Sequence, residues 1–170
     1  MTEELFRQDS YLKDCAATVT AVTEDGAIVL DRTVFYPTGG GQPGDIGTLT
    51  KADGTEIAIA DTRKGEAGIL HIPADGAAAV AAGDTVTATI DWDRRYRLMR
   101  MHTSLHLLCA CIEGDVTGGQ IGAEKSRLDF NLPEMPMTKE ELADKINALV
   151  QGGHDLSMEW ITDAEMDANP

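Results

Sequence analysis

Residues 91–112 read DWDRRYRLMRMHTSLHLLCACI, and this stretch decides how the chain is organised. No glycine or proline interrupts it, and its apolar residues recur at helical spacing. Asp91 or Asp93 can cap the amino end of a helix, and Gly114 marks an exit from it. The stretch therefore predicts one long amphipathic helix, which divides the sequence into two parts of different pattern.

The 92 residues before this helix predict strands and turns. Gly and Asp punctuate short β-rich runs, as in a small closed or half-closed barrel. Glu24-Asp25-Gly26 predicts a hairpin turn, and residues 74–82 predict a loop or a short helix. The predicted strands are 17–22, 27–30, 46–50, 56–61, 69–72 and 85–91.

The residues after the long helix mix both patterns. Residues 127–132 alternate as a half-buried strand does, and Thr138 with Glu141 forms a capping box. Asp163 is expected to cap a third helix. We expect the second helix to bury Leu142, Ile146, Leu149 and Val150, and an alternating run to contain Leu156, Met158 and Trp160. The sequence thus predicts an α+β protein with a β-barrel domain at 1–92 and an α+β domain at 93–170.

Composition narrows the class of protein. With 170 residues, 42% of them hydrophobic, the chain can bury a core in one large or two small domains. No apolar run approaches the roughly 20 residues that span a bilayer, and the polar, acidic Met1–Asp14 is no signal peptide. We therefore expect a cytoplasmic protein with no membrane partner. The three cysteines, Cys15, Cys109 and Cys111, are expected to be free and buried.

A net charge of −15 argues against a protein that coats DNA or an RNA duplex with its whole surface. The positive charges are nevertheless clustered. Lys125 and Arg127 lie near a glycine-rich motif, and four arginines lie in the long helix: Arg94, Arg95, Arg97 and Arg100. A local basic patch can grip one RNA end, while a solvated helix face with extended arginines explains the cluster equally well.

His102 and His106 lie one helical turn apart and share a face. Two imidazoles so placed can converge on one metal ion, or they can be core-edge histidines with local hydrogen bonds. Cys109 lies seven residues beyond His102, too far along the helix to join the same ion. His71 and His154 remain candidate ligands. The local sequence offers half a metal site.

Two glycine-rich segments accompany the histidines. Residues 35–45 read FYPTGGGQPGD, in which Gly39, Gly40 and Gly41 leave the backbone open to a ligand, and Gln42 and Asp45 add directional polar groups. A plain turn with a flexible tip is the alternative. Residues 117–122 read TGGQIG, and the amide of Gln120 can lie beside whatever the histidines hold.

Three segments occur together in this order, namely FYPTGGGQPGD (35–45), RLMRMHTSLHLL (97–108) and GGQIGAEKSRLDF (118–130). Together they resemble the editing domain of alanyl-tRNA synthetase and its free-standing relatives, the AlaX proteins, over nearly the whole chain. The longer AlaX type is the closest in pattern. The resemblance implies a barrel like those of translation factors, followed by the α+β editing unit shared by threonyl- and alanyl-tRNA synthetases.

The resemblance also implies an activity and a set of residues. Family members bind Zn²⁺ through His-x-x-x-His and a later Cys-x-x-x-His, and they hydrolyse seryl- or glycyl-tRNA(Ala). His102 and His106 match the first ligand pair, and Gln120 matches a glutamine of the editing pocket. Gly39 to Gln42 match the glycine-rich motif of the longer type. With Asp45, Arg100 and Arg127, these residues are expected to bind the acceptor end of tRNA(Ala).

The sequence departs from the family pattern at two points. It lacks the Cys-x-x-x-His pair, so we expect a chain that stops before its second pair of zinc ligands. Many synthetases have threonine just before the second histidine, where this chain has Leu105, and Thr103 supplies the nearest hydroxyl. Gln120 and Thr103 are the expected catalytic residues of the deacylase. The rival interpretations are a non-catalytic tRNA-binding module with structural zinc and an inactive fragment of a synthetase-like protein.

Overall fold

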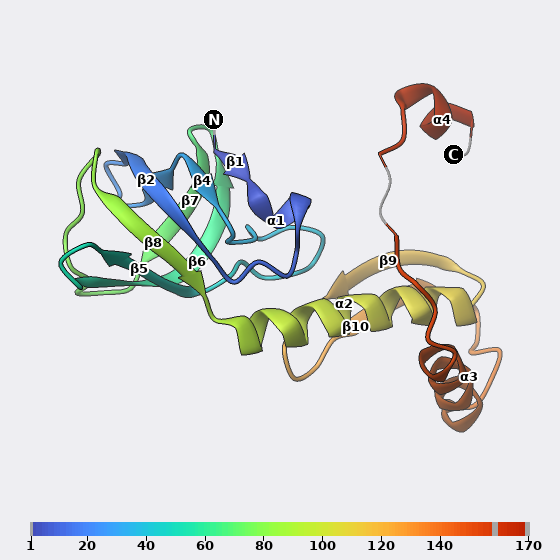
Figure 1. The fold of residues 1–170 in the computed structure, drawn as a ribbon. Helices are drawn as coiled ribbons and strands as arrows, with labels where there is room; N and C mark the ends of the chain where they lie inside the picture. The colour runs from blue at the N-terminus through green and yellow to red at the C-terminus, as the bar shows by residue number, and fades with distance from the viewer. Residues whose placement is uncertain (1, 158–159, 169–170) are drawn as a thin grey trace.

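Six strands close into a barrel in the first half of the computed structural model (Figure 1), which describes residues 2–157 and 160–168. The order around the barrel is β2-β3-β7-β6-β5-β8, and every neighbouring pair is antiparallel. The strands are β2 (Asp14–Val22), β3 (Ile28–Leu30), β5 (Gly47–Lys51), β6 (Glu56–Gly65), β7 (Gly68–Pro73) and β8 (Thr85–Ile90). The predicted barrel and α+β class are confirmed.

The barrel core follows from the alternation of the strands. In β8, for example, Val86, Ala88 and Ile90 are buried while the threonines between them are exposed. Because the sheet is closed, one face of every strand points inward, and aliphatic residues fill the interior. Its fully buried members include Val19, Leu30, Val34, Phe35, Leu49 and Ile57. This core holds the base of the glycine-rich segment, since Val34 and Phe35 directly precede it.

The amino terminus adds elements that the sequence pattern did not predict. Strand β1 (Glu3–Glu4) pairs in parallel with β4 (Arg32–Thr33), and helix α1 (Leu5–Gln8) follows β1. Phe6 of α1 is buried and meets the ring of Tyr36 edge-on at 5.6 Å between centroids. Elements of two to four residues are too short to show a periodic pattern.

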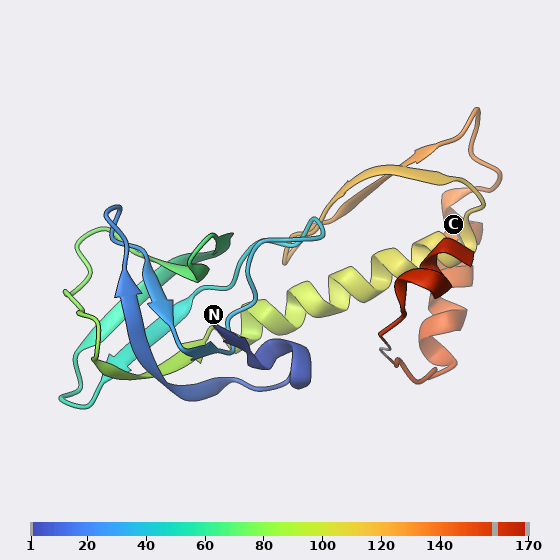
Figure 2. The same cartoon turned by 90° about the horizontal axis from the view of Figure 1, so that it is seen from above.

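Helix α2 (Trp92–Cys111) runs out of the barrel as the long helix that residues 91–112 predict (Figure 1). Of the two candidate caps, Asp91 accepts a hydrogen bond from the backbone N–H of Arg94 at 3.0 Å. After α2 the chain turns back through β9 (Asp115–Gln120) and returns through β10 (Arg127–Asn131), an antiparallel ribbon. Figure 2 shows the near end of this ribbon beside the loop that leaves the barrel before β5.

The last two helices are partly as expected. Helix α3 (Lys139–Gln151) begins with the predicted capping box, in which Thr138 and Glu141 bond reciprocally. The predicted burial of its apolar face is wrong, because Leu142, Ile146 and Leu149 are only half-buried and Val150 is 58% exposed. Helix α4 (Asp163–Ala168) forms where a third helix was predicted, but the Thr162 hydroxyl, not Asp163, accepts from the Glu165 N–H.

The segment between α3 and α4 gives little support to a further strand. Leu156 and Trp160 lie in irregular backbone and are 75% and 90% exposed. Met158, the third residue of the expected alternation, lies outside the described residues. The division into domains at residues 92 and 93 stays a prediction. No helix among the described residues is long and apolar enough to cross a membrane.

Candidate functional site at the junction of barrel and helix

The glycine-rich segment forms a narrow arm between β4 and β5. At its base, the Asp45 N–H bonds the Tyr36 carbonyl at 2.9 Å, and at its tip Gly39 and Gln42 exchange two backbone hydrogen bonds of 3.0 Å. The two residues between them, Gly40 and Gly41, have φ of +58° and +75°, as in the tight turns that need glycine at both central positions. The three glycines therefore form an ordered hairpin tip.

Gln42 carries the arm's contact with the histidine helix. Its side chain is 4% exposed, and its Oε1 lies 3.0 Å from Nδ1 of His102. A carbonyl oxygen can only accept, so this bond places the ring proton on Nδ1 and leaves the lone pair on Nε2. Gln42 was expected to bind substrate, whereas the structure shows it holding one tautomer and one orientation of His102.

The two histidines lie side by side on α2, as their spacing predicts. Their ring centroids are 5.1 Å apart and the planes differ by 14°, with His102 half-buried and His106 exposed. Partial burial, reinforced by the neighbouring His106, lowers the pKa of His102 below its ordinary value. His102 is therefore neutral at neutral pH, with a free nitrogen that can take a proton or bind a metal.

A buried ion pair fixes the arm to α2 below the histidines. Oδ2 of Asp45 accepts from Nη1 of Arg95 and from the Tyr36 N–H, and Nη2 of Arg95 donates to the Val34 carbonyl at 3.2 Å. Both residues are at most 2% exposed. Arg94 adds a bond of 2.8 Å from Nη1 to the Gly44 carbonyl. The first turns of α2 are thereby attached to the base of the arm.

Asp45 was expected to bind substrate, and its carboxyl group lies in an enclosed environment. Burial raises the pKa of this carboxyl above its ordinary value, and the Arg95 guanidinium opposes that shift. Its second oxygen, Oδ1, has no hydrogen-bond partner in the part of the chain that the structure describes. A carboxylate enclosed in this way holds the arm to α2, and its expected contact with substrate stays a prediction. Arg95 precedes His102 by two helical turns, and its contact with Asp45 was not predicted.

The β9–β10 ribbon brings a third element to the arm. The Ile121 N–H donates to the Gly41 carbonyl at 2.9 Å, which fixes the end of β9 against the hairpin tip. Gln120 is the preceding residue and is exposed, in register with Arg127 of β10. Arg127 is also exposed, and its Nε lies 3.2 Å from Oδ1 of Asp129. Gln120 is therefore near the arm, whereas Arg127 is engaged in a surface ion pair.

The remaining predicted residues lie on α2 or elsewhere. Thr103 is exposed and follows His102, and Arg100 is exposed with its guanidinium 5.9 Å from the centre of the Tyr96 ring. His71 is fully buried in the barrel between the Thr33 hydroxyl and the Ile28 carbonyl, which excludes it as a ligand beside His102. His154 is exposed after α3.

The three cysteines differ in exposure. Cys109 is exposed, which contradicts its expected burial, and Cys15 and Cys111 are half-buried. Within residues 2–157 and 160–168, no three His, Cys, Asp or Glu side chains group as a metal site. The histidine pair can supply two of the four ligands typical of zinc, and the described residues do not complete the set.

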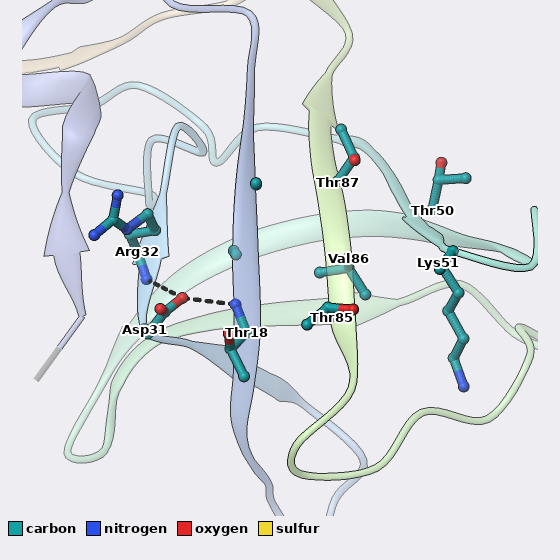
Figure 3. Close-up of a pocket in the computed structure, with 11 residues that line it drawn as sticks. Thr18, Asp31, Arg32, Thr50, Lys51, Thr85, Val86 and Thr87 are labelled. Carbon is teal, nitrogen blue, oxygen red and sulfur yellow. Dashed lines mark hydrogen bonds between the residues drawn. The ribbon is translucent and has the colours of Figure 1, made fainter.

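A pocket on the barrel is separate from this junction. It lies between β2, β5 and β8 and is lined by several threonines, with Arg32 and Lys51 at its edges (Figure 3). The Asp31 carboxylate there accepts from the N–H groups of Thr18 and Arg32 at 2.7 and 2.9 Å. None of the residues expected to form the functional site lines it.

Comparisons with known proteins identify relatives of this chain. Residues 6–94 match the family described as tRNA synthetases class II (A). The chain is 42% identical over 175 aligned positions to the alanyl-tRNA editing protein AlaX-M of Methanosarcina acetivorans, covering 97% of this chain and 71% of that protein. It is 39% identical over 168 positions to AlaX-M of Pyrococcus horikoshii, covering 94% of this chain and 75% of that protein.

Synthetases are also among the relatives. The alanine–tRNA ligase of Pyrobaculum neutrophilum is 40% identical over 154 positions, covering 84% of this chain and 16% of the ligase. The chain spans between 63% and 75% of the lengths of five AlaX-M proteins. This chain therefore belongs to the family of alanyl-tRNA editing proteins, AlaX-M, and shares its sequence pattern with a segment of alanine–tRNA ligases.

Proposed function

We propose that the protein hydrolyses the ester of a mischarged tRNA(Ala), carrying serine or glycine, in the cytoplasm and as a free-standing enzyme. The observation that supports this proposal is the bond between Gln42 and His102 at the junction of arm, helix and ribbon. It provides a neutral imidazole with an available Nε2 at a place enclosed by three separate elements. Ester hydrolysis requires such a group to orient or deprotonate a water.

The hairpin tip can supply the stabilisation of negative charge that the reaction also requires. Within the described residues, the N–H groups of Gly40 and Gly41 have no hydrogen-bond acceptor. Gly40 lies against His102, since a Cβ built on Gly40 would be 3.9 Å from Cε1 of that ring. Two open N–H groups beside the imidazole suit an oxyanion or a ribose oxygen of the terminal nucleoside. Gln120 and Thr103 stay candidate catalytic residues at the edge of this space.

Zinc is part of the proposal wherever a second pair of ligands completes the site. His102 and His106 would hold the ion, which would polarise the substrate or its attacking water. A pair of imidazoles gives half of a zinc coordination shell, so we expect this 170-residue chain to retain zinc weakly. The chemistry assigned to this chain therefore uses its own imidazole, amide and backbone N–H groups.

Selectivity follows from the same open backbone. A pocket with polar groups placed for the serine hydroxyl would leave those groups unpaired when alanine binds, and unpaired buried groups disfavour the wrong substrate. The test compares release of the amino acid from Ser-, Gly- and Ala-tRNA(Ala), with and without chelator. Equal loss from all three at the uncatalysed rate would remove the proposal.

A non-catalytic tRNA-binding module is the rival function. His106→Ala separates the two when the protein is loaded with zinc: the enzyme loses turnover and keeps tRNA binding, whereas a non-catalytic module shows no turnover even in the parent protein. His154→Ala is the matched control, since it removes another exposed imidazole from the chain. Zinc titration of the same three proteins measures how much affinity each histidine contributes.

A further inference from the structure

A row of aromatic rings and cations follows the first turns of α2 on a face that the histidine site does not use, and all its members are exposed except Trp92, which is half-buried against the barrel core. We call it the aromatic–basic strip, and it consists of Tyr11, Lys13, Trp92, Tyr96 and Arg100. The rings of Trp92 and Tyr96 stack with centroids 5.6 Å apart and planes 23° apart, and Tyr11 lies 5.7 Å from Trp92. Tyr11 is 60% exposed and Tyr96 is 40% exposed.

Each cation of the strip lies over an aromatic ring. Lys13 Nζ lies 5.0 Å from the centre of the Trp92 ring, and the Arg100 guanidinium lies 5.9 Å from that of Tyr96. Within the described part of the chain neither forms an ion pair, although acidic residues outnumber basic ones by 29 to 14. A cation held over a ring keeps its charge available to a phosphate.

The geometry points to an RNA strand as the occupant, and we propose that the aromatic–basic strip binds the acceptor end of tRNA next to its terminal nucleoside. Exposed rings alternating with cations are the surface on which bases stack while phosphates are neutralised. On α2 the strip spans nine residues from Trp92 to Arg100, a rise of about 12 Å. This inference rests on the proposed function for the identity of the RNA.

The strip also has a definite relation to the histidine site. Arg100 lies two residues before His102. The strip residues of α2, taken together, are centred about 100° around the helix axis from the histidine pair. A strand on the strip would therefore have to pass round one side of α2 for its 3′ end to reach His102 and His106. Of the four arginines in the basic cluster, Arg94 and Arg95 are bonded to the arm, whereas Arg97 and the strip residue Arg100 are exposed.

The experiment measures binding of a fluorescent hairpin that copies the acceptor stem with its single-stranded 3′ end, using anisotropy over 50–200 mM salt. Tyr96→Leu should weaken binding about 5- to 100-fold, and Tyr96→Phe should bind as the parent does, because stacking requires the ring and not the hydroxyl. Lys13→Gln and Arg100→Gln should each lower the slope of log affinity against log salt by about 0.7–0.9. Lys64→Gln, which removes one exposed charge from the barrel strand β6, should leave both quantities unchanged.

The outcomes separate this inference from the proposed function. Parent-like affinity and salt slope in Tyr96→Leu, Lys13→Gln and Arg100→Gln would overturn the strip, even if the chain hydrolyses Ser-tRNA(Ala). Weakened binding in those variants supports the strip, even if no variant and no parent protein shows hydrolysis. If Tyr96→Leu is thermally unstable, the two charge variants decide, since both side chains are exposed. In an active protein, strip variants should raise KM and leave kcat unchanged.

Discussion

Breaking the buried pair of Asp45 and Arg95 should destabilise the protein strongly, because each residue is at most 2% exposed. Removal of either partner leaves the other charge buried without its counterion, which costs about 3–5 kcal/mol. A domain of this size has about 5–15 kcal/mol of stability in total. The expected fall in Tm is about 6–20 °C for Asp45→Asn and for Arg95→Met.

The pair is tested most sharply by a double-mutant cycle with urea unfolding. Asp45→Asn keeps an acceptor for the Tyr36 N–H, and Arg95→Met keeps most of the side-chain volume. The double variant should lose clearly less stability than the sum of the single losses, with a coupling energy of about 2 kcal/mol or more. The control cycle uses Arg32 and Glu3, an ion pair 3.2 Å apart with side chains 49% and 43% exposed, where about 0.2–1 kcal/mol is expected.

Additive losses in the Asp45 and Arg95 cycle would refute the claim that these two charges depend on each other. A second readout tests the link to the site, because the pair holds the arm whose Gln42 bonds His102. At temperatures well below Tm, the ring signals of His102 should broaden or shift in both single variants. Unchanged His102 signals would mean that the arm keeps its position without the pair.

Three further predictions concern single positions. His71 is buried, and desolvation lowers its pKa to about 4, from 6.5. Its contribution to the free energy of unfolding is therefore complete above pH 6.5, and about 3 kcal/mol is lost as the pH falls through 4. His71→Gln should flatten this dependence of the unfolding free energy on pH, measured by urea unfolding at several pH values. Gly41→Ala and Gly26→Ala should each lower the free energy of unfolding by about 1–2 kcal/mol, because both positions have positive φ. Only Gly41→Ala should also slow hydrolysis, and an equal effect of both variants on hydrolysis contradicts the role of the hairpin tip. Gln42→Leu should give a mixture of His102 tautomers by nitrogen NMR and about 10- to 100-fold slower hydrolysis, and a single unchanged tautomer would show that the amide does not select it.

Local patterns predicted most of the regular elements. The barrel strands alternate clearly, and the caps at Asp91 and Thr138 are encoded within four residues of where they act. Strand β9 was missed because its sequence, DVTGGQ, contains two glycines and one β-branched pair, and it exists through its pairing with β10. The apolar face of α3 was predicted to be buried, but burial requires a covering surface, which periodicity does not specify.

The sequence indicated which residues lie near one another at the candidate site better than it indicated what each residue contacts. The spacing of His102 and His106 determined that the rings would be neighbours, and the glycines of the arm indicated an unusual turn. The roles of Gln42 and Asp45 depend on partners 60 and 50 residues away, on another element. A polar side chain in a glycine-rich loop looks accessible in sequence, and only the contact of α2 with the arm shows that it is buried.

The uninterrupted course of α2 lets one helix join a rigid part of the protein to a looser one. Its first turns are anchored by Arg95 and Leu98, both at most 2% exposed, whereas no side chain from Met99 to Cys111 is fully buried. Amide hydrogens in the first turns should exchange with solvent only when the barrel opens, and those beyond His106 should exchange through local fraying. The histidines lie between the slowly and the rapidly exchanging parts of α2. A bound substrate that reduces local fraying of the far half should therefore slow amide exchange at the histidines first.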